Sequence, residues 1–577
     1  MAAVDSLLGP ADSLWSGGER RPADDHVAYG GRSRRSQRHL LLPVLHAIQD
    51  RIGWVSRGAL EYACRRLSIP PAEAFGVVSF YARFALHDRG PLALHVCDDV
   101  ACKCAGADEI CARLESTVGP AGGAWHRSAC LGLCDVAPAA LVERSGAAHE
   151  ERQLGSITFE EADGILRGGA WPREAARPMP RQRGRMLRRI GEYDPDSLDG
   201  YLSVGGFEAL ARARDVGAEA VIREVTDARL LGRGGAAFPT GRKWESVAKA
   251  VARPHYLVCN ADESEPGTFK DRVLMESDPF AVVEGMAIAA FATGCDKGFV
   301  YIRTEYPLAR KRIENAIAQT SARGLLDIDI EVRRGAGVYI CGEETALFNS
   351  IEGKRGEPRN KPPFPVEVGL FGKPTLPNNV ETLVNMLDIV VGGGAAFVSI
   401  GTKDSSGTRQ FCVSGDVERP GLYEVAMGTP LRALLDMAGS HKLQAVLLGG
   451  AAGSFLTPEQ VDVPLSFEGT RAIGATLGSG AVIVFGETAD MKQVLLRIAR
   501  FFRDESCGQC VPCRVGTKRQ EEILERMLAS HGGDSRADVM LLSDIAQAMR
   551  DASICGLGQT AASAIASGLT QLKVLNG

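Results

Sequence analysis

The 577-residue sequence has few features that would place it in a membrane, on a nucleic acid or outside the cell. It contains no uninterrupted apolar run of about 18 residues, the length that a membrane-spanning helix needs. Its start, MAAVDSLLGPADSLWSGGERRPADDH, lacks a basic segment followed by an apolar one, so we expect no secretory signal. The net charge of −5 gives no reason to expect nucleic-acid binding. We therefore expect a cytoplasmic protein of ordinary globular composition, with about three or four domains.

Cysteine, by contrast, is plentiful. Fifteen cysteines in a chain without a secretory signal are expected to be ligands or buried thiols rather than disulfides. The run ESCGQCVPCRVGT holds Cys507, Cys510 and Cys513 between two predicted helices, and Cys555 is the only cysteine that follows. A CxxCxxC run with a distant fourth cysteine is typical of a 4Fe–4S cluster, which we favour over zinc, although zinc stays open.

A second group of cysteines lies at two predicted strand-to-loop transitions in the N-terminal part: Cys97, Cys102, Cys130 and Cys134. Four thiolates in two spaced pairs suit a 2Fe–2S cluster. Cys111 falls within a predicted helix and is most simply a packing residue. Cys104 is a neighbour of this group or, less simply, a substitute ligand. Two clusters of different type would pass electrons singly over a distance.

Hydrophobic periodicity and turn signals divide the chain into several segments and predict a mixed α/β, multidomain protein. Arg and Pro enrichment marks one segment as a linker, for which a solvated connector is favoured over a docking site. The expected segments are a poorly ordered arm (1–38), an α/β module (39–166), the linker (167–195), a larger α/β region (196–407), a small β-rich domain (408–486) and a helical bundle (487–577).

The stretch LLGRGGAAFPTGRKW contains Gly232, Gly234 and Ala237 in the order GxGxxA. This is a weak match to a dinucleotide fingerprint, because the preceding VIREVTDARLL is predicted to be helical rather than a strand. A simple tight turn is the alternative. Glycines nevertheless let backbone N–H groups approach a phosphate or a flat ring, and Arg233 and Lys243 add positive charge.

Acidic residues crowd the end of the next predicted strand, in CNADESEPGTFKDR, where Asp262, Glu263 and Glu265 fall within four residues. They form either a solvated turn or a site for the hydroxyl groups of a ribose or ribityl chain, which donate to carboxylates. Further along, Glu343 and Glu344 stand at a predicted helix start among Gly-, Pro- and Asn-rich loops. Such a helix N-terminus can face a phosphate.

Together these stretches closely resemble the NADH-oxidising flavoprotein subunit of respiratory complex I, fused behind its small thioredoxin-like 2Fe–2S subunit. The segments that carry the resemblance are GRGGAAFPTGRKW, NADESEPGTFKDR, ICGEETAL, KPPFP, NNVET and ESCGQCVPCR, and the match extends over roughly residues 38–577. The resemblance implies a thioredoxin-like 2Fe–2S domain, a Rossmann-like domain for FMN and NAD(H), a β-grasp domain and a C-terminal four-helix bundle with a 4Fe–4S cluster. It also implies that the triplet and Cys555 are the ligands of that cluster.

The resemblance assigns roles residue by residue. The expected FMN contacts are Gly232, Gly234, Gly235, Lys243, Asn260, Asp262, Glu263, Ser264, Gly342, Glu343, Asn378, Asn379 and Thr382. The expected nucleotide contacts are Phe238, Glu265, Glu344, Lys361 and Phe364, with Glu344 also the candidate for influence on the flavin chemistry or on nucleotide release. Two positions depart from the family pattern: Pro377 replaces a commoner aliphatic residue, and Ser246 stands where some members place an aromatic ring against adenine.

Fusion of the two modules bears on the partner. By family analogy it is found in NAD-linked formate dehydrogenases and in NAD-reducing hydrogenases, whereas complex I usually keeps the modules apart. We expect a diaphorase subunit that reduces NAD+ with electrons from formate, oxidised on a partner subunit that contains molybdenum or tungsten. The alternatives are the diaphorase of an NAD-reducing hydrogenase and the NADH-dehydrogenase module of a complex I-like enzyme. FMN joins two-electron hydride chemistry to single-electron transfer. A purely structural iron–sulfur scaffold is disfavoured by the glycine and acidic loops, and a quinone reductase by the lack of a membrane-facing segment.

Overall fold

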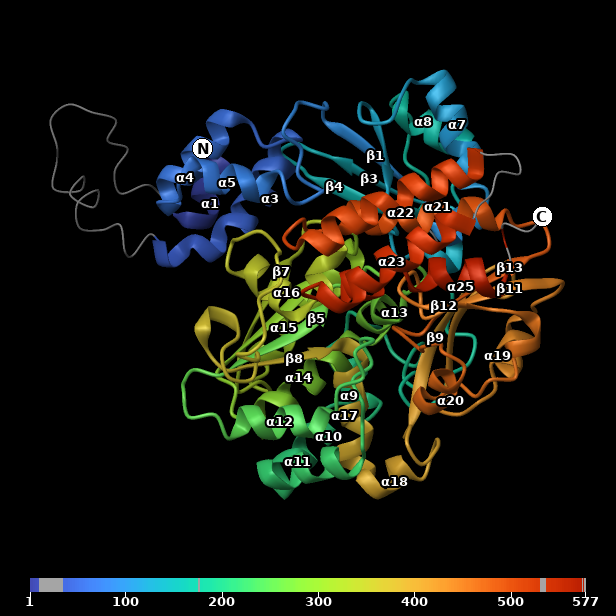
Figure 1. Ribbon diagram of the computed structural model, residues 1–577. Coiled ribbons are helices and arrows are strands. Elements are labelled where there is room, and N and C mark those ends of the chain that lie inside the picture. Colours follow the sequence, from blue (N-terminus) through green and yellow to red (C-terminus); the bar gives the residue numbers. More distant parts are fainter. Residues whose placement is uncertain (10–34, 175–176, 530–535, 573, 575–577) are drawn as a thin grey trace, which may run out of the picture.

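The computed structural model describes residues 1–9, 35–174, 177–529, 536–572 and 574 (Figure 1). The parallel sheet at its centre has the strand order β7-β6-β5-β8. Alternate residues of its strands enter two different cores, with Leu257 and Cys259 on one face and Val258 on the other. Burial on both faces is the usual state of an all-parallel sheet. The four strands are β5 (Tyr256–Ala261), β6 (Lys297–Ile302), β7 (Asp329–Arg334) and β8 (Thr375–Asn379).

Helices of the same domain cover one face of this sheet. The long apolar helix α14 (Pro279–Thr293) is buried along almost its whole length, and its Gly285 lets the backbone of Leu383 approach. The other helices on this face are α9 (Leu198–Ser203), α10 (Glu208–Val216), α11 (Ala218–Asp227), α12 (Thr240–Ala248), α13 (Lys270–Ser277), α15 (Pro307–Ala322), α17 (Val380–Gly392) and α18 (Gly394–Val398). Helix α16 (Glu344–Ile351) packs in the core on the opposite face.

The N-terminal helices cover the opposite face. Leu45 and Tyr81 belong to the same core as Phe299, Tyr301 and Phe348, so this part of the chain packs on the central sheet. The helices are α3 (Leu41–Ile52), α4 (Arg57–Leu67) and α5 (Pro71–Val78), preceded by the 3-10 turn η2 (Gln37–Leu40). Residues 39–166 thus contribute both to the core on this face of the central sheet and to the cores of their own sheet.

The predicted arm, residues 1–38, contains a docked helix. In α1 (Ala2–Leu8), Val4 is buried, and the Asp5 carboxylate pairs with Arg66 and accepts a hydrogen bond of 2.7 Å from the Tyr62 hydroxyl. This helix therefore adds to the N-terminal core. Residues 10–34, which make up most of the arm, lie outside the described residues.

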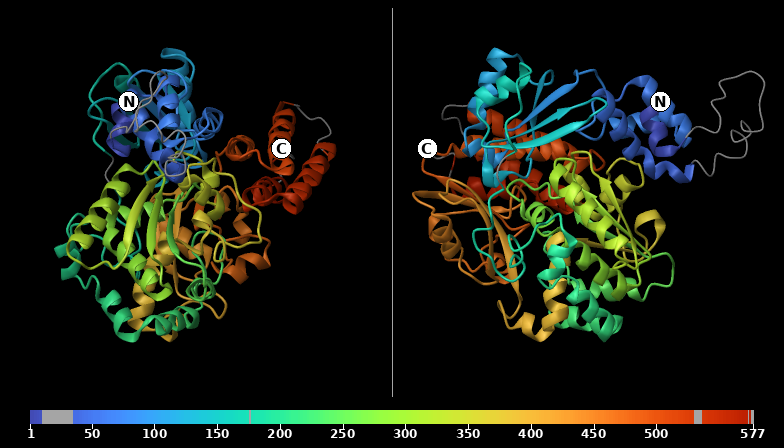
Figure 2. Two further views of the ribbon diagram at one scale, coloured as in Figure 1. Left: turned by 90° about the vertical axis from the view of Figure 1, so that its left-hand side faces the viewer. Right: turned by 180° about the vertical axis from the view of Figure 1, so that it is seen from behind.

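The thioredoxin-like part has its own four-stranded sheet, in the order β2-β1-β3-β4. Strands β1 and β2 are parallel and the other pairs are antiparallel. Figure 2 shows it beside the central domain, on the same side as the C-terminal helices. Its elements are β1 (Leu92–Cys97), α6 (Val100–Cys104), α7 (Ala107–Thr117), β2 (Trp125–Ser128), η3 (Cys134–Val136), β3 (Ala139–Arg144), β4 (Glu150–Gly155) and α8 (Phe159–Leu166).

The β-grasp part is a five-stranded sheet in the order β10-β9-β13-β11-β12, with β9 and β13 parallel. The linker docks on its edge, since Arg181 N donates to Leu422 O and the Glu424 carboxylate accepts from the backbone of Gly184, Met186 and Leu187. The linker is thus bound where the sequence favours a solvated connector. The elements are β9 (Thr408–Gly415), β10 (Gly421–Ala426), α19 (Leu431–Ala438), β11 (Leu443–Leu448), β12 (Ser454–Leu456), α20 (Phe467–Ala472) and β13 (Ala481–Gly486).

The C-terminal helices form the predicted bundle, which packs against the β-grasp sheet through a shared core. Arg497 reaches from this bundle to the thioredoxin-like part, where it pairs with Asp98 at 3.2 Å. None of the helices in the described part of the chain is long and apolar enough to cross a membrane. The helices are α21 (Met491–Glu505), α22 (Val511–Ala529), α23 (Arg536–Ala552), α24 (Gly556–Thr560) and α25 (Ser563–Gln571).

Candidate functional site

Two adjoining cavities open beside the carboxyl ends of β5 and β8. The larger has a volume of about 360 Å³ and the smaller about 120 Å³, and they share Gly234, Ala236, Asn260 and Asn379. The volume of the larger cavity is in the range of small-molecule and cofactor sites. Of the residues expected to contact FMN, the larger cavity is lined by Gly234, Gly235, Asn260, Asp262, Glu263, Ser264, Gly342, Glu343 and Asn379. The smaller adds Gly232, Lys243, Asn378 and Thr382, so the fold brings the whole predicted set together.

The glycine loop follows helix α11, as the sequence predicts, and not a strand. A Cβ at Gly234 would stand 3.1 Å from Asn379 Cβ, so a side chain here would reduce the space between the loop and β8. Two hydrogen bonds of Arg233 fix the loop. Arg233 N donates to Thr382 Oγ1 at 2.9 Å, and the buried Arg233 guanidinium donates to Ser406 O. Burial lowers the pKa of Arg233 to about 10 despite the nearby Glu381 carboxylate.

The acidic loop and β8 each present a buried polar atom that lacks a partner. Within the described residues, the buried atoms Asp262 Oδ2 and Asn378 Nδ2 have no hydrogen-bond partner, although both side chains line the cavities. Burial raises the pKa of Asp262 well above its ordinary value. An acceptor and a donor left open at a cavity wall suit a ligand with hydroxyl and ring polar atoms, because unpaired buried groups are costly. These residues therefore fit FMN.

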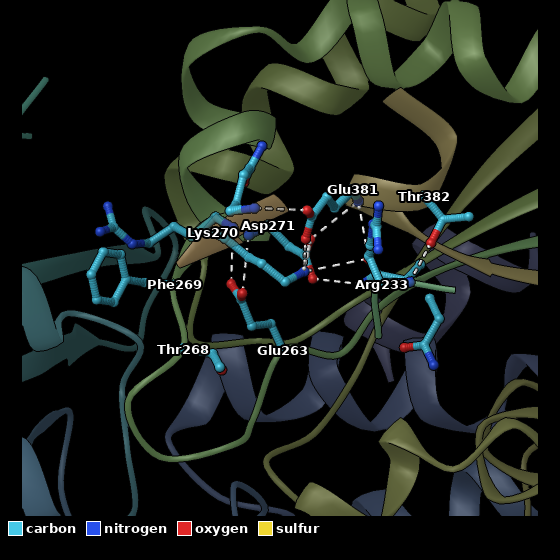
Figure 3. Close-up of polar contacts among 12 residues, drawn as sticks. Arg233, Glu263, Thr268, Phe269, Lys270, Asp271, Glu381 and Thr382 are labelled. Carbon is cyan, nitrogen blue, oxygen red and sulfur yellow. Dashed lines mark hydrogen bonds and ion pairs between the residues drawn. The ribbon is translucent and has the colours of Figure 1, made fainter. Parts of the chain in front are cut away.

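Glu263 is engaged differently from its acidic neighbours. Its two carboxylate oxygens accept from Asp271 N and Arg272 N, both at 3.0 Å, and so bind the first turn of α13. Burial raises its pKa to about 7. Glu263 lines the larger cavity, but its carboxylate holds the helix that forms the cavity wall (Figure 3).

A buried ion cluster in the wall of the larger cavity was not identified from the sequence. Lys270 Nζ lies 2.7 Å from Asp271 Oδ1 and 3.3 Å from both Glu381 Oε2 and Asn379 Oδ1. Asn379 Nδ2 donates to Asp271 Oδ2 at 2.6 Å, so the cluster fixes the orientation of Asn379. Lys270 and Asp271 stand in the NADESEPGTFKDR segment. The sequence therefore contains both residues, but charged residues that follow a loop are ordinarily exposed to solvent, so their burial was not expected.

Two of the expected nucleotide residues, Phe238 and Glu344, line the smaller cavity. Glu344 lies between two lysines, at 2.8 Å from Lys361 Nζ and 3.5 Å from Lys243 Nζ. Burial opposes ionisation of Glu344, but both lysines outweigh it and hold its pKa below the ordinary value. The rings of Phe238 and Phe364 are 45% and 52% exposed, and exposed aromatic faces can stack on a base or a nicotinamide. Lys361 and Phe364 line neither cavity.

Glu265, also expected at the nucleotide, is buried in the wall of the larger cavity. Its carboxylate accepts a hydrogen bond from the Tyr339 hydroxyl and another, of 2.9 Å, from Ala452 N. Burial raises the pKa of Glu265 to about 7.

Parts of the chain far away in sequence close the larger cavity. Loops of the β-grasp part contribute Gly449, Ala452, Thr476, Gly478 and Ser479. The short helix α24 contributes Gly556, Leu557 and Thr560, directly after Cys555. No local pattern in the sequence marked these residues, since they become wall residues only through the packing of three domains.

The N-terminal thiols form two close pairs. Cys130 Sγ and Cys134 Sγ are 3.4 Å apart, and a hydrogen bond between Cys97 and Cys102, together with burial, raises the pKa of Cys97. All four are buried, and Cys97 and Cys130 interact electrostatically with Cys134. Two pairs fit a two-iron cluster in which each iron takes two thiolates. Cys104 is exposed instead, and Cys111 packs in the core of the thioredoxin-like sheet.

The C-terminal thiols gather where α21, α22 and α24 meet. Cys507 and Cys510 lie between α21 and α22, Cys513 in the first turn of α22, and Cys555 is the N-cap of α24. Burial and the other three thiols raise the pKa of Cys513 to about 12, which shows their proximity. Yet no group of three or more His, Cys, Asp or Glu residues in the described ranges could hold a single metal ion. A 4Fe–4S cluster is held by four cysteine thiolates, and four thiols gather at this junction of helices.

Four family descriptions match successive parts of the chain. They are a thioredoxin-like 2Fe-2S ferredoxin over residues 29–166, the Nuo51 FMN-binding domain over 225–388, the SLBB domain over 410–446 and the NADH-ubiquinone oxidoreductase-F iron-sulfur binding region over 493–573. Fold and site thus define an NAD(H)-linked flavoprotein that binds FMN, a 2Fe–2S cluster and a 4Fe–4S cluster. The chain belongs to the family of NADH-binding flavoprotein subunits that resemble the complex I flavoprotein, here fused with the thioredoxin-like 2Fe–2S domain.

Similar proteins are found in several enzyme complexes. The NADP-reducing hydrogenase subunit HndC of Solidesulfovibrio fructosivorans is 43% identical over 387 residues, which are 65% of this chain and 78% of that protein. One NADH-quinone oxidoreductase subunit of Rhizobium meliloti is 41% identical over 403 residues, 67% of this chain and 95% of the relative. In the crystal structure of an NAD+-reducing NiFe-hydrogenase, one chain matches with a TM-score of 0.82 at 35% identity, and 93% of both chains is covered.

Proposed function

We propose that this chain is the diaphorase subunit of a complex that reduces NAD+ with electrons from formate, oxidised on a partner subunit that contains molybdenum or tungsten. The observation that supports the diaphorase role is the position of the cavities between two groups of cysteines. Gly556, next to Cys555, lines the larger cavity, while Arg303 joins Glu263 in the cavity wall to the loop of Cys130. A flavin held there exchanges electrons with a cluster on either side.

The residue roles belong to the same proposal. Gly234, Asn379 and the open atoms of Asp262 and Asn378 hold the flavin, together with the rest of the set that lines the two cavities. Phe238, Phe364, Lys361, Glu344 and Glu265 hold the nicotinamide nucleotide. The 2Fe–2S ligands are Cys97, Cys102, Cys130 and Cys134, and the 4Fe–4S ligands are Cys507, Cys510, Cys513 and Cys555.

A second proposal differs from this one only in the electron donor, which is hydrogen instead of formate. Formate rests on the fusion of the two modules, which is an analogy with known enzymes. A hydrogenase partner is favoured by a different observation, the match over 93% of both chains to a chain of an NAD+-reducing NiFe-hydrogenase. In both cases the site that oxidises the donor belongs to another subunit, and this chain carries the electrons to NAD+.

The proposal is tested in two stages, first with the chain alone and then with the native complex. The chain alone, supplied with iron and flavin, is expected to show flavin absorbance and to reduce ferricyanide or a viologen with NADH. Absence of bound flavin in an iron-replete chain would refute the diaphorase role. The native complex is then assayed for NAD+ reduction with formate and with hydrogen, and activity with hydrogen alone would replace the formate proposal by the hydrogenase one.

A further inference from the structure

The loop that carries Cys130 has an unusual hydrogen-bond pattern. Three consecutive backbone carbonyls each accept from a buried side chain rather than from backbone. Cys130 O accepts from Arg303 Nη2 at 2.7 Å, Leu131 O from Gln153 Nε2 at 3.2 Å and Gly132 O from Arg272 Nε at 2.8 Å. All three donors are themselves buried.

One of these donors, Gln153, turns a carbonyl away from a thiol. In the peptide unit between Leu131 and Gly132, the oxygen faces Gln153 and the N–H on the opposite side donates to Cys130 Sγ at 3.4 Å. A trans peptide points its C=O and N–H in opposite directions, so the carbonyl donors also set the amide direction. Gly132 is required here, because its φ is +68° and a Cβ would stand 2.1 Å from the Tyr306 hydroxyl.

Two of the three donors come from the flavin-binding domain. Arg272 belongs to α13 and also holds Asp135 through two hydrogen bonds of 2.8 Å. Arg303 follows β6, and its other terminal nitrogen donates to Glu263 O at 2.7 Å. Glu263 lines the larger cavity. One guanidinium therefore joins the cavity wall to the backbone of a cluster ligand.

We propose that Arg303 is a positioning residue for the 2Fe–2S centre, which raises the reduction potential of that centre by orienting the Cys130 loop and by placing a buried positive charge beside it. Hydrogen bonds to cluster sulfurs and nearby charge are among the factors that set such potentials. The reduced centre carries one more negative charge than the oxidised one, so the Arg303 cation and the Gly132 N–H that faces Cys130 Sγ favour reduction. The inference rests on the proposed ligand set and not on the identity of the electron donor.

The test is a redox titration of the purified full chain, followed by low-temperature EPR. Arg303→Gln is expected to lower the midpoint potential of the 2Fe–2S signal and to leave the 4Fe–4S potential unchanged. Gln153→Met removes the Leu131 O donor without removing a charge, and is expected to shift the same signal in the same direction by a smaller amount. Arg303→Lys keeps the charge but cannot bridge Cys130 O and Glu263 O, and should give an intermediate shift.

Arg310→Gln is the matched control. Arg310 also joins the flavin-binding domain to the thioredoxin-like sheet, but it pairs with Glu151 instead of a loop carbonyl. This variant should leave both potentials in place. An unchanged 2Fe–2S potential in Arg303→Lys and in Gln153→Met, or an equal shift of both clusters in Arg303→Gln, would overturn the inference. An unmodified chain without any 2Fe–2S signal would instead refute the ligand assignment.

Discussion

Single thiols decide which cluster each part of the chain holds. Cys510→Ser is expected to delete the 4Fe–4S signal from low-temperature EPR and to leave the 2Fe–2S signal, because the two groups of thiols belong to different domains. Cys102→Ser should do the reverse. Cys104 is exposed, whereas the four proposed ligands are buried, so Cys104→Ser should keep both signals. Loss of the 2Fe–2S signal in the Cys104 variant but not in the Cys102 variant would contradict this ligand set.

The charge state of Glu265 should affect the choice between NADH and NADPH. Its pKa of about 7 means that it is mostly neutral below pH 7 and mostly ionised above. An ionised carboxylate repels a 2′-phosphate, and about 1 kcal/mol of repulsion changes a ratio about fivefold. The kcat/KM ratio of NADH to NADPH should therefore rise between about pH 6 and pH 8.

Glu265→Gln is the control for this pH dependence, because it keeps the shape of the side chain and retains only the titration of the nucleotide itself. Its ratio should stay near the low-pH value of the unmodified chain. A ratio that rises equally in both forms would exclude Glu265 as the source of the discrimination.

At the level of helices and strands, local pattern was a good guide. The apolar segments TRQFCVSG and AVIVFG coincide with β9 and β13, and the helix before the glycine loop is present as α11. Glu343 caps α16 by accepting from the backbone of Thr345 and Ala346, as acidic residues at a helix start often do. These features depend on neighbours in the sequence, which is why the sequence predicts them.

Local sequence pattern does not predict which part of the molecule packs on each helix or strand. Periodicity shows that the helices α3 to α5 have an apolar face, but not that this face covers β6 and α16 of another domain. Likewise the sequence suggests that the Glu263 carboxylate faces a ligand, whereas in the structure it accepts hydrogen bonds from the first turn of α13. Both facts depend on contacts between distant segments, which a single sequence does not encode by spacing.

The loop between β11 and β12 offers a test of how one element shapes the cavity. Gly450 has a φ of +79°, and a Cβ there would stand 2.5 Å from Glu265 Cγ. Gly450→Ala should therefore displace Glu265 from Tyr339 and Ala452 and raise the KM for NADH several-fold. Gly474→Ala is the matched control, since its φ is +72° and its Cβ would meet open space. A left-handed alanine costs about 1 kcal/mol in both variants, so both should unfold at a lower temperature. An equal change of KM in both would assign the effect to strain alone.

At the scale of the whole molecule, the thioredoxin-like part is held by buried contacts from two directions. Arg272 donates two 2.8 Å hydrogen bonds to Asp135 from the flavin-binding domain, and Arg497 pairs with Asp98 from the helical bundle. Behind them, the N-terminal helices share an apolar core with the central sheet. The thioredoxin-like part and the C-terminal helices therefore lie on the same side of the flavin-binding domain (Figures 1 and 2). The position of the 2Fe–2S cluster relative to the flavin site therefore depends on these contacts between domains and not on the thioredoxin-like part alone.

Separate expression of residues 1–174 and 177–577 tests this dependence. The two chains should co-purify when they are produced together, because the shared core and the buried ion pairs do not need the covalent link. Salt at 1 M reduces the screening length to about 3 Å and weakens exposed ion pairs, but buried pairs are screened much less. The complex should therefore persist at high salt during size-exclusion chromatography. Exchange of Arg272 for Met leaves Asp135 buried without its partner, at a cost of about 3–5 kcal/mol, and should release the N-terminal chain. Elution of an unmodified, folded N-terminal chain alone would show that its contacts with the flavin-binding domain contribute little to assembly.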